Sequence, residues 1–381
     1  MPMLFLLLVA ASALAQSKPQ THPSNTTESL RGASAVSQNV AWASGTHGTY
    51  LRTTDAGRTW LPAQVPDAST LDFRAVIAFS ADEAFLMSAG PGEQSRIYHT
   101  SDAGKTWQLQ FTNHNPKGFF DSMVFWDRTH GVVLGDPIPD QTGSAKEAGQ
   151  PKFELLITTD GQTWTPIPPA QLPPAIEGEG AFAASNTCLA ILSGGAEASP
   201  KLDEQNGASA PEANIWFATG GEVARVFHSP DRGQTWQVFD TPIIHGQDST
   251  GIFSIAFRDP LHGVIAGGDY KHPEQDGPDL AFTNDGGKTW TLSPIRPQAY
   301  FSAAAYDRRK RNPQSQALDD NRAQIRLFVV APKFIFDFRP PKDPTRISPR
   351  KKSPMQFNAV SPYPQGGALI VGPKGSIAII P

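Results

Sequence analysis

The chain has 381 residues, 39% of them apolar, and a formal net charge of −4 at pH 7. This mild acidity removes any overall electrostatic reason to expect nucleic acid or an anionic membrane surface as a partner. The 33 glycines and 35 prolines favour many short strands joined by turns over a helical protein. We therefore expect one large all-β domain.

The chain begins with an apolar run at residues 3–15, which ends in Ala13-Leu14-Ala15 before Gln16. Small residues at this spacing suit a signal peptidase, and the run is shorter than the roughly 20 residues of a membrane-spanning helix. We expect a signal peptide at 1–15, a polar N-terminal segment at 16–29, and a periplasmic or secreted mature protein.

A turn motif of the form Ser/Thr-x-Asp-x-Gly-x-Thr-Trp occurs five times. The copies are TTDAGRTW at 53–60, TSDAGKTW at 100–107, TTDGQTW at 158–164, SPDRGQTW at 229–236 and TNDGGKTW at 283–290. Their tryptophans recur at intervals of about 47 to 72 residues, close to one four-stranded blade of roughly 40 to 50 residues plus insertions. The repeats predict a β-propeller.

This motif resembles the Asp-box, or BNR repeat, of sialidases and many other propellers. The Asp and Ser/Thr side chains can hydrogen-bond turn amides, the Gly permits a positive φ, and the Trp buries a large ring. We therefore assign structural roles to Asp55, Gly57, Trp60, Asp102, Gly104, Trp107, Asp160, Trp164, Asp231, Gly233, Trp236, Asp285, Gly287 and Trp290.

Two apolar segments recur upstream of each motif and twice more after the last copy. The first segments begin at Leu30, Phe73, Phe119, Gly178, Ile252, Tyr300 and Phe357, and the second at Ala41, Ala84, His130, Asn214, His262, Arg326 and Gly367. Seven pairs predict a seven-bladed β-propeller spanning 30–381. In the fourth blade we assign TCLAILSGG and NIWFATGG to one blade. The last blade shows three strands, so its outer strand is expected from residues 20–27.

Aligned on their leading large residue, the first segments share a polar position. It holds Arg31, Arg74, Asp121, Ser254, Ser302 and Asn358, with Glu179 as a looser seventh member. Because strand alternation points equivalent residues the same way, we predict a polar ring at one mouth of the central channel. The alternative is that these residues are polar only because they line a water-filled channel. The two arginines with carboxylates suit an anionic or peptide group more than catalysis.

No metal or cofactor is predicted. His130 and His262 occupy equivalent places in different blades, as Asp136 and Asp269 do, which indicates repeated turns rather than convergent ligands. The chain has no GxGxxG opening a helix and no cysteine pair. The single Cys188 lies in an apolar run and is expected to be a buried strand residue.

The AWASG and HGV second segments, followed by TTDAGxTW motifs across 30–381, resemble the photosystem II stability and assembly factor family. This resemblance implies a lumenal or periplasmic propeller without catalytic residues that binds a nascent membrane-protein subunit. The chain departs from that pattern in its long insertions and in lacking the motif in its last two blades. We therefore expect a non-catalytic exported scaffold with a protein or peptide partner, such as a membrane or envelope protein.

A sialidase-like or other glycoside hydrolase, with a glycan as its ligand, is the alternative. Such enzymes resemble one another in an Arg-Ile-Pro segment, three arginines and a Tyr/Glu pair. The nearest match, Phe73-Arg74-Ala75-Val76, lacks the Ile-Pro. An acid and base pair would require Asp121 and Glu179 to converge with separated pKa values.

Overall fold

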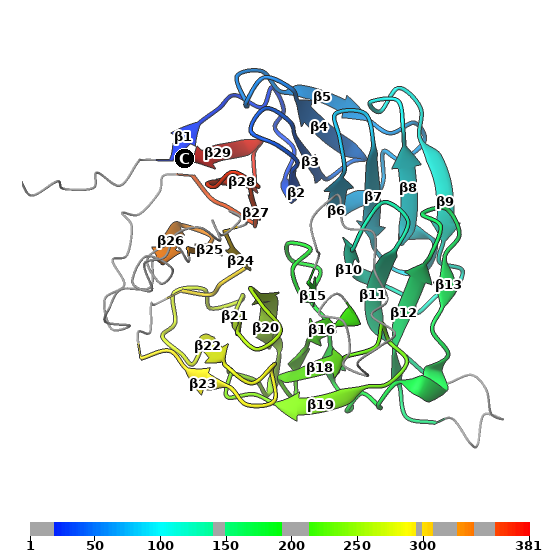
Figure 1. The fold of residues 1–381 in the computed structure, drawn as a ribbon, viewed down its shortest axis with the longest axis vertical. Helices are drawn as coiled ribbons and strands as arrows, with labels where there is room; N and C mark the ends of the chain where they lie inside the picture. Colours follow the sequence, from blue (N-terminus) through cyan, green and yellow to red (C-terminus); the bar gives the residue numbers. More distant parts are fainter. Residues whose placement is uncertain (1–18, 140–148, 193–212, 295–298, 308–325, 339–354) are drawn as a thin grey trace, which may run out of the picture.

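The computed structural model describes residues 19–139, 149–192, 213–294, 299–307, 326–338 and 355–381, in which seven antiparallel sheets surround a central channel (Figure 1). The chain is therefore a seven-bladed β-propeller, as predicted. The expected signal peptide, 1–15, lies outside the described residues and stays a prediction. Within the described ranges, no helix is long and apolar enough to cross a membrane.

Each of the first three blades has four strands, running outward from the channel. Blade 1 contains β2 (Leu30–Ala35), β3 (Ala41–Gly45), β4 (Thr49–Thr53) and β5 (Leu61–Gln64). Blade 2 contains β6 (Asp72–Ala78), β7 (Ala84–Ala89), β8 (Arg96–Thr100) and β9 (Gln108–Thr112). Blade 3 contains β10 (Phe120–Phe125), β11 (Gly131–Ile138), β12 (Lys152–Thr158) and β13 (Thr165–Pro166).

The remaining blades vary more. Blade 4 contains β15 (Leu189–Ile191), β16 (Ile215–Ala218), β18 (Arg225–Ser229) and β19 (Gln237–Asp240). Blade 5 contains β20 (Gln247–Phe257), β21 (Gly263–Asp269), β22 (Leu280–Thr283) and β23 (Thr291–Leu292), and its inner edge is extended by β17 (Gly220–Gly221) and β14 (Glu179–Gly180). Blade 6 contains β24 (Ala303–Tyr306), β25 (Leu327–Ala331) and β26 (Phe334–Phe338).

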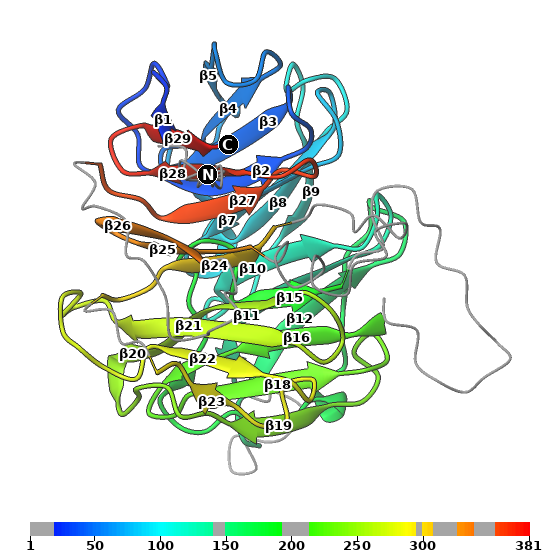
Figure 2. The ribbon, with the colours of Figure 1, turned by 60° about the vertical axis from the view of Figure 1, so that its left-hand side comes forward.

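Blade 7 combines both ends of the described chain. It contains β27 (Ala359–Pro362), β28 (Ala368–Gly372), β29 (Ser376–Ile380) and, outermost, β1 (Gln20–Thr21). Strand β1 pairs with β29, with Gln20 opposite Ile379, and the two lie side by side in Figures 1 and 2. The expectation that residues 20–27 supply the outer strand is confirmed. Hydrogen bonds between the two ends therefore close the ring.

The apolar core lies between the blades. Trp42 of blade 1 packs with Phe73 and Leu86 of blade 2, and Leu51 packs with Leu369 of blade 7. Every residue of the middle strand β3 is buried, whereas all four of the outer strand β5 are exposed. A strand covered on both faces carries apolar residues without alternation, which explains the continuous apolar runs of the second segments.

The fourth blade corrects one expectation. Its innermost strand is β15, from TCLAILSGG, whereas the predicted first segment at Gly178 forms only β14, which pairs with β17. The aliphatic residues of β15 can pack between blades, and the small residues around Gly178 cannot. The assignment of TCLAILSGG and NIWFATGG to one blade is confirmed, because β15 pairs with β16. Cys188 is buried immediately before β15.

Candidate binding site at the channel mouth

The repeated turns link the third and fourth strands of blades 1 to 5. In each copy the Asp Oδ1 accepts a hydrogen bond from the Ser/Thr hydroxyl two residues earlier, at 2.8 to 3.1 Å. It also accepts one from the amide of the later Thr, at 2.7 to 3.0 Å. The side-chain and backbone hydrogen bonds of Thr59 lower the pKa of Asp55 to about 2. In four of the five copies the Asp Oδ2 also accepts from the hydroxyl of the later Thr, at 2.6 to 2.7 Å, so both carboxylate oxygens are used within the turn.

The glycines and tryptophans of these turns also serve the turn itself. Gly57 adopts a φ of +79°, a conformation that side chains other than glycine rarely allow. The corresponding values for the other turn glycines are 84° for Gly104, 90° for Gly233 and 93° for Gly287. Trp60, Trp164 and Trp290 are buried, whereas Trp107 and Trp236 are half-buried.

A β-bulge gives the inner strands a common feature at the channel. In β2, Leu30 faces Gly45 and Gly32 faces Ser44, so Arg31 is the extra residue. The same shift makes Arg74 the extra residue of β6 and Asp121 that of β10. A bulge re-aims the side chain of its extra residue. The bulges therefore take these polar residues out of the regular alternation of side chains between the two faces of their strands.

The bulge in blade 5 corrects the predicted ring. In β20, Ile252 faces Gly267 and Ser254 faces Ala266, so Phe253 takes the position of Arg31 and Arg74. The alignment was wrong by one residue there, because Ile252 rather than Phe253 matches the leading large residues of the other strands. The ring is therefore interrupted by an aromatic side chain.

Arg31 and Arg74 are the bulge residues of β2 and β6, two inner strands that contact each other in neighbouring blades. The Nε of Arg74 donates to Asp72 Oδ2 at 2.8 Å, and its Nη1 donates to the carbonyl oxygen of Ala183 at 2.7 Å. Burial lowers the pKa of Arg31, and the positive charge of Arg74 lowers it further. The Nε of Arg31 is buried with no hydrogen-bond partner among the described residues.

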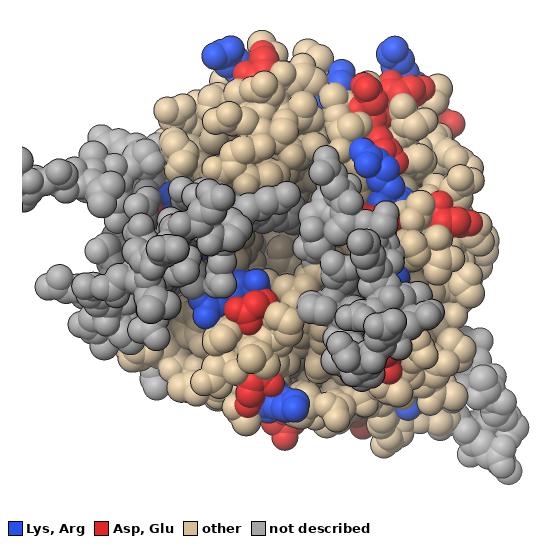
Figure 3. Space-filling view, in the orientation of Figure 1, with Lys and Arg blue, Asp and Glu red and all other residues tan. Residues whose placement is uncertain are grey.

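An aromatic wall stands beside the arginines. Phe253 stacks on Phe182 with ring centroids 4.0 Å apart and meets Tyr300 edge-on at 4.7 Å. Burial raises the pKa of Tyr300, which keeps its phenol neutral, and its charge interactions with both arginines place it near them. We call Arg31, Asp72, Arg74, Phe182, Phe253 and Tyr300 the channel mouth. The ring is hollowed at its centre, with charged side chains on the rim (Figure 3).

The other predicted ring members make internal bonds. Ser254 Oγ accepts from the amide of Ala304 at 2.8 Å, and Asn358 Nδ2 donates to the carbonyl oxygen of Leu30 at 2.8 Å, so each joins neighbouring blades. Ser302 Oγ donates to the carbonyl oxygen of Val330 at 3.3 Å. Of the seven predicted residues, the structure places only Arg31 and Arg74 in the channel mouth.

Glu179 and Asp121 do not converge as an acid and base pair. Glu179 is buried, and its carboxylate accepts hydrogen bonds from Arg225 Nη2 at 2.5 Å and from Thr219 Oγ1 at 2.6 Å. Asp121 instead neighbours Asp136, and its side chain is buried. In the described part of the chain, no cluster of three or more His, Cys, Asp or Glu residues could hold a metal ion.

Most of the predicted first segment that begins at Gly178 forms no strand and instead lies near the centre of the ring. Residues 181–187, which we call the channel segment, precede β15 near the centre of the ring (Figure 1). The side-chain amide of Asn186 bonds both the N–H and the carbonyl of Met123 in blade 3, at 2.7 and 2.9 Å. The carbonyl of Thr187 accepts from Ile255 in blade 5 at 2.8 Å, and Ser185 Oγ donates to Ser302 in blade 6 at 2.6 Å.

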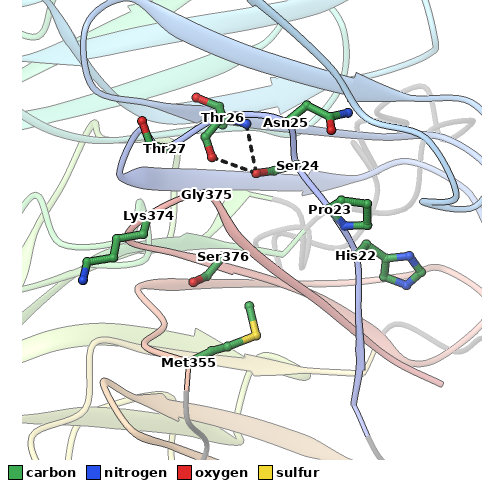
Figure 4. Close-up of a pocket in the computed structure, with 10 residues that line it drawn as sticks. All are labelled: His22, Pro23, Ser24, Asn25, Thr26, Thr27, Met355, Lys374, Gly375 and Ser376. Carbon is green, nitrogen blue, oxygen red and sulfur yellow. Dashed lines mark hydrogen bonds between the residues drawn. The ribbon is translucent and has the colours of Figure 1, made fainter.

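A separate pocket of about 740 Å³ lies at the closure of the ring (Figure 4). It is lined by residues 22–27, by Met355, by Lys374 and Gly375 of the turn that leads into β29, and by Ser376, the first residue of that strand. The Ser24 hydroxyl makes two hydrogen bonds with Thr26. Its Oγ accepts from the amide of Thr26 at 3.4 Å and donates to the carbonyl oxygen of Thr26 at 3.2 Å. The pocket is thus walled by the seam that joins the two ends of the chain.

Comparisons with known proteins agree with a seven-bladed propeller. No family model matches the chain. Over 67 residues it is 34% identical to the photosystem II stability/assembly factor HCF136, chloroplastic, of Oryza sativa subsp. japonica, a match that covers 17% of this chain and only 15% of that protein.

Solved structures are similar over nearly the whole length. YCF48 bound to D1 peptide has a TM-score of 0.61 at 17% identity, covering 97% of this chain and 96% of that one. YCF48 from Cyanidioschyzon merolae has a TM-score of 0.55 at 15% identity, covering 96% and 98%. The WD40 propeller domain of Doa1 has a TM-score of 0.55 at 9% identity, covering 95% and 97%. At these identities the likeness shows the fold.

Proposed function

We propose that this propeller is a non-catalytic binding scaffold whose channel mouth takes a peptide segment of another protein. The observation that carries the proposal is the presence of Arg31 and Arg74 on adjacent inner strands near the half-buried rings of Phe182 and Tyr300, which pack on the buried Phe253. Guanidinium groups recognise carboxylates, and rigid aromatic surfaces bury apolar side chains at small entropic cost. The preferred ligand is therefore an acidic peptide with an apolar or aromatic neighbour.

Two further observations support a peptide ligand over a glycan substrate. The similar solved structure of YCF48 holds a D1 peptide. The acid and base pair that a hydrolase would need is absent in the predicted form, because Glu179 is bonded to Arg225 and Asp121 is buried. The proposal includes export, on the basis of the apolar run at 3–15, and a membrane or envelope protein as the source of the peptide.

The test is selection of a random-peptide phage library on the purified propeller. Selected peptides are expected to carry Asp or Glu beside an aromatic residue and to lose about tenfold or more of their affinity on Arg31→Ala with Arg74→Ala, since charge-assisted hydrogen bonds contribute about 1.5 to 3 kcal/mol each. The matched control is Arg58→Ala with Arg128→Ala, which removes two exposed arginines from other turns. Peptides that bind the mouth variant and the wild type equally would overturn the proposal.

A further inference from the structure

The channel segment is held by side chains rather than by strand pairing. Asp136 Oδ1 accepts a hydrogen bond from the amide of Ala181 at 2.9 Å, and the buried side chain of Asp121 lies beside Asp136. The side chain of Asn186 takes the place of a neighbouring strand for Met123: its Oδ1 accepts from the N–H of Met123 and its Nδ2 donates to the carbonyl oxygen of Met123. Buried backbone groups need such partners. Removing one of these side chains would therefore loosen the segment without removing a strand from any blade.

The same segment supplies part of the channel mouth. Phe182 forms the stack on Phe253, and the carbonyl of Ala183 accepts the hydrogen bond from Arg74. Asp72 holds the guanidinium of Arg74 from the opposite side. The direction of Arg74 is therefore set jointly by β6 and by the channel segment.

We propose that the channel segment positions Arg74 and Phe182 for the partner, and that Asp136, with the buried Asp121 beside it, forms a clasp that holds the segment in place and loosens when these carboxyl groups ionise. This inference rests on the proposed function for its effect on binding. The clasp itself stands on the hydrogen bond from the amide of Ala181 to Asp136 Oδ1 and on the burial of Asp121. Asp121, Asp136 and Asn186 are thus positioning residues, since they act on a ligand only through the segment.

The charges around the clasp favour protonation. Burial raises the pKa of Asp136 to about 6, against the opposing effect of the Ala181 amide. Burial and then the charge of Asp136 raise the pKa of Asp121 well above its ordinary value, and Arg74 only partly offsets this. Burial likewise raises the pKa of Glu154 on the neighbouring strand β12 and that of the Cys188 thiol, which favours their neutral forms. Neither group can supply a positive charge that would offset the two carboxylates.

The direction of the pH effect follows from these shifts. Both carboxyl groups bind protons more tightly in the closed clasp than in an open, solvated one. The clasp is therefore most stable at mildly acidic pH, and it weakens as the pH rises through about 6, the pKa of Asp136. Partner binding should weaken over the same range.

Hydrogen exchange measured by mass spectrometry tests the clasp without any ligand. After correction for intrinsic rates, opening at Ala181, Met123 and Ile255 should rise about tenfold or more from about pH 4.5 to about pH 7.5. Asp136→Asn keeps the acceptor oxygen but cannot ionise, so its exchange should stay slow at both values. Asp121→Asn is the second variant should that one fail to fold, and Asp82→Asn, at an exposed carboxylate, is the matched control.

Affinity for a phage-selected peptide gives the second readout. The wild type should bind several-fold more weakly at the higher pH, Asp136→Asn should retain its affinity there, and Asn186→Ala should bind weakly at both values. Exchange that is independent of pH in the wild type, or equally dependent in Asp136→Asn, would overturn the clasp. Failure to select any peptide while exchange behaves as expected would instead overturn the proposed function and leave the clasp standing.

Discussion

The aspartates of the repeated turns, which we call the rim because they lie between the two outer strands of each blade, and the aspartates beside the channel have pKa values shifted in opposite directions. The pKa of Asp102 in a rim turn falls to about 2 because the backbone amide and then the hydroxyl of Thr106 bond to its carboxylate. The pKa of Asp136 beside the channel rises to about 6 because burial outweighs its hydrogen bond to Ala181. Aspartate thus stabilises a local turn in its ionised form and a tertiary contact in its protonated form. The difference shows that the role of an aspartate depends on how exposed its carboxyl group is to water and on how many hydrogen-bond donors surround that group.

The largest expected effect lies in the packing of the rim. Trp60→Ala should lower the free energy of unfolding by about 3 to 5 kcal/mol, because the ring of Trp60 is fully buried between blades 1 and 7. Trp107→Ala, at the equivalent but half-buried position, should cost less. Denaturant unfolding of both variants makes the comparison, and equal losses would show that burial of the ring is not what stabilises the turn.

Next in size is the ion pair that anchors the chain leading into the channel segment. Arg225→Ala should cost about 3 kcal/mol, because it leaves the buried carboxylate of Glu179 without its cation. Adding Glu179→Gln should recover part of this loss by removing the charge. Thermal unfolding of the single and double variants checks it, and an equally unstable double variant would argue against the unpaired charge as the cause.

The channel carboxyl groups should give the protein an unusual pH dependence. The folded-state pKa of Asp136 is raised, so its contribution is present at about pH 4 and is lost as the pH rises through about 6. Asp136→Asn should therefore be more stable than the wild type at about pH 8, by up to about 3 kcal/mol, and should lose this advantage toward pH 5. A difference that does not change with pH would contradict the assignment.

The smallest expected effect belongs to an exposed rim carboxylate. Asp102→Ala removes its bonds to Thr100 and Thr106, and should lower the melting temperature by about 1 to 3 °C at neutral pH. Because the pKa of Asp102 is depressed, the loss should shrink as the pH falls from about 4 toward 2. Calorimetry across this range measures how the stability loss of Asp102→Ala changes with pH. The stability contribution of Asp136 beside the channel should change with pH in the opposite direction.

Much of the fold could be predicted from local patterns. The turn motifs depend on hydrogen bonds within five or six neighbouring residues, so TSDAGKTW specifies the same turn wherever it occurs. The seven pairs of apolar segments marked the blades, and the absence of a fourth strand after GSIAIIP led to the correct closure by residues 20–27.

The candidate site was predicted only in part. Arg31 and Arg74 were found because they follow the leading large residue of a first strand, but the same rule selected Ser254 instead of Phe253. Glu179 was misplaced because its ion pair with Arg225 joins residues far apart in the chain. Sequence reasoning assigned the start of 181–187 to the first strand that begins at Gly178, because nothing local in AFAASNT shows that these residues form a loop instead of a strand.

The sequence by itself determined the number of blades, the rim turns and the residues that pack between sheets, because each rests on contacts among near neighbours or on the period of apolar residues. Only the tertiary structure decided what lies at the centre. Bulges one residue long re-aimed the inner side chains, and a loop from blade 4 found its hydrogen-bond partners on blades 2, 3, 5 and 6. Such contacts depend on where distant segments meet in space, and no local pattern encodes that.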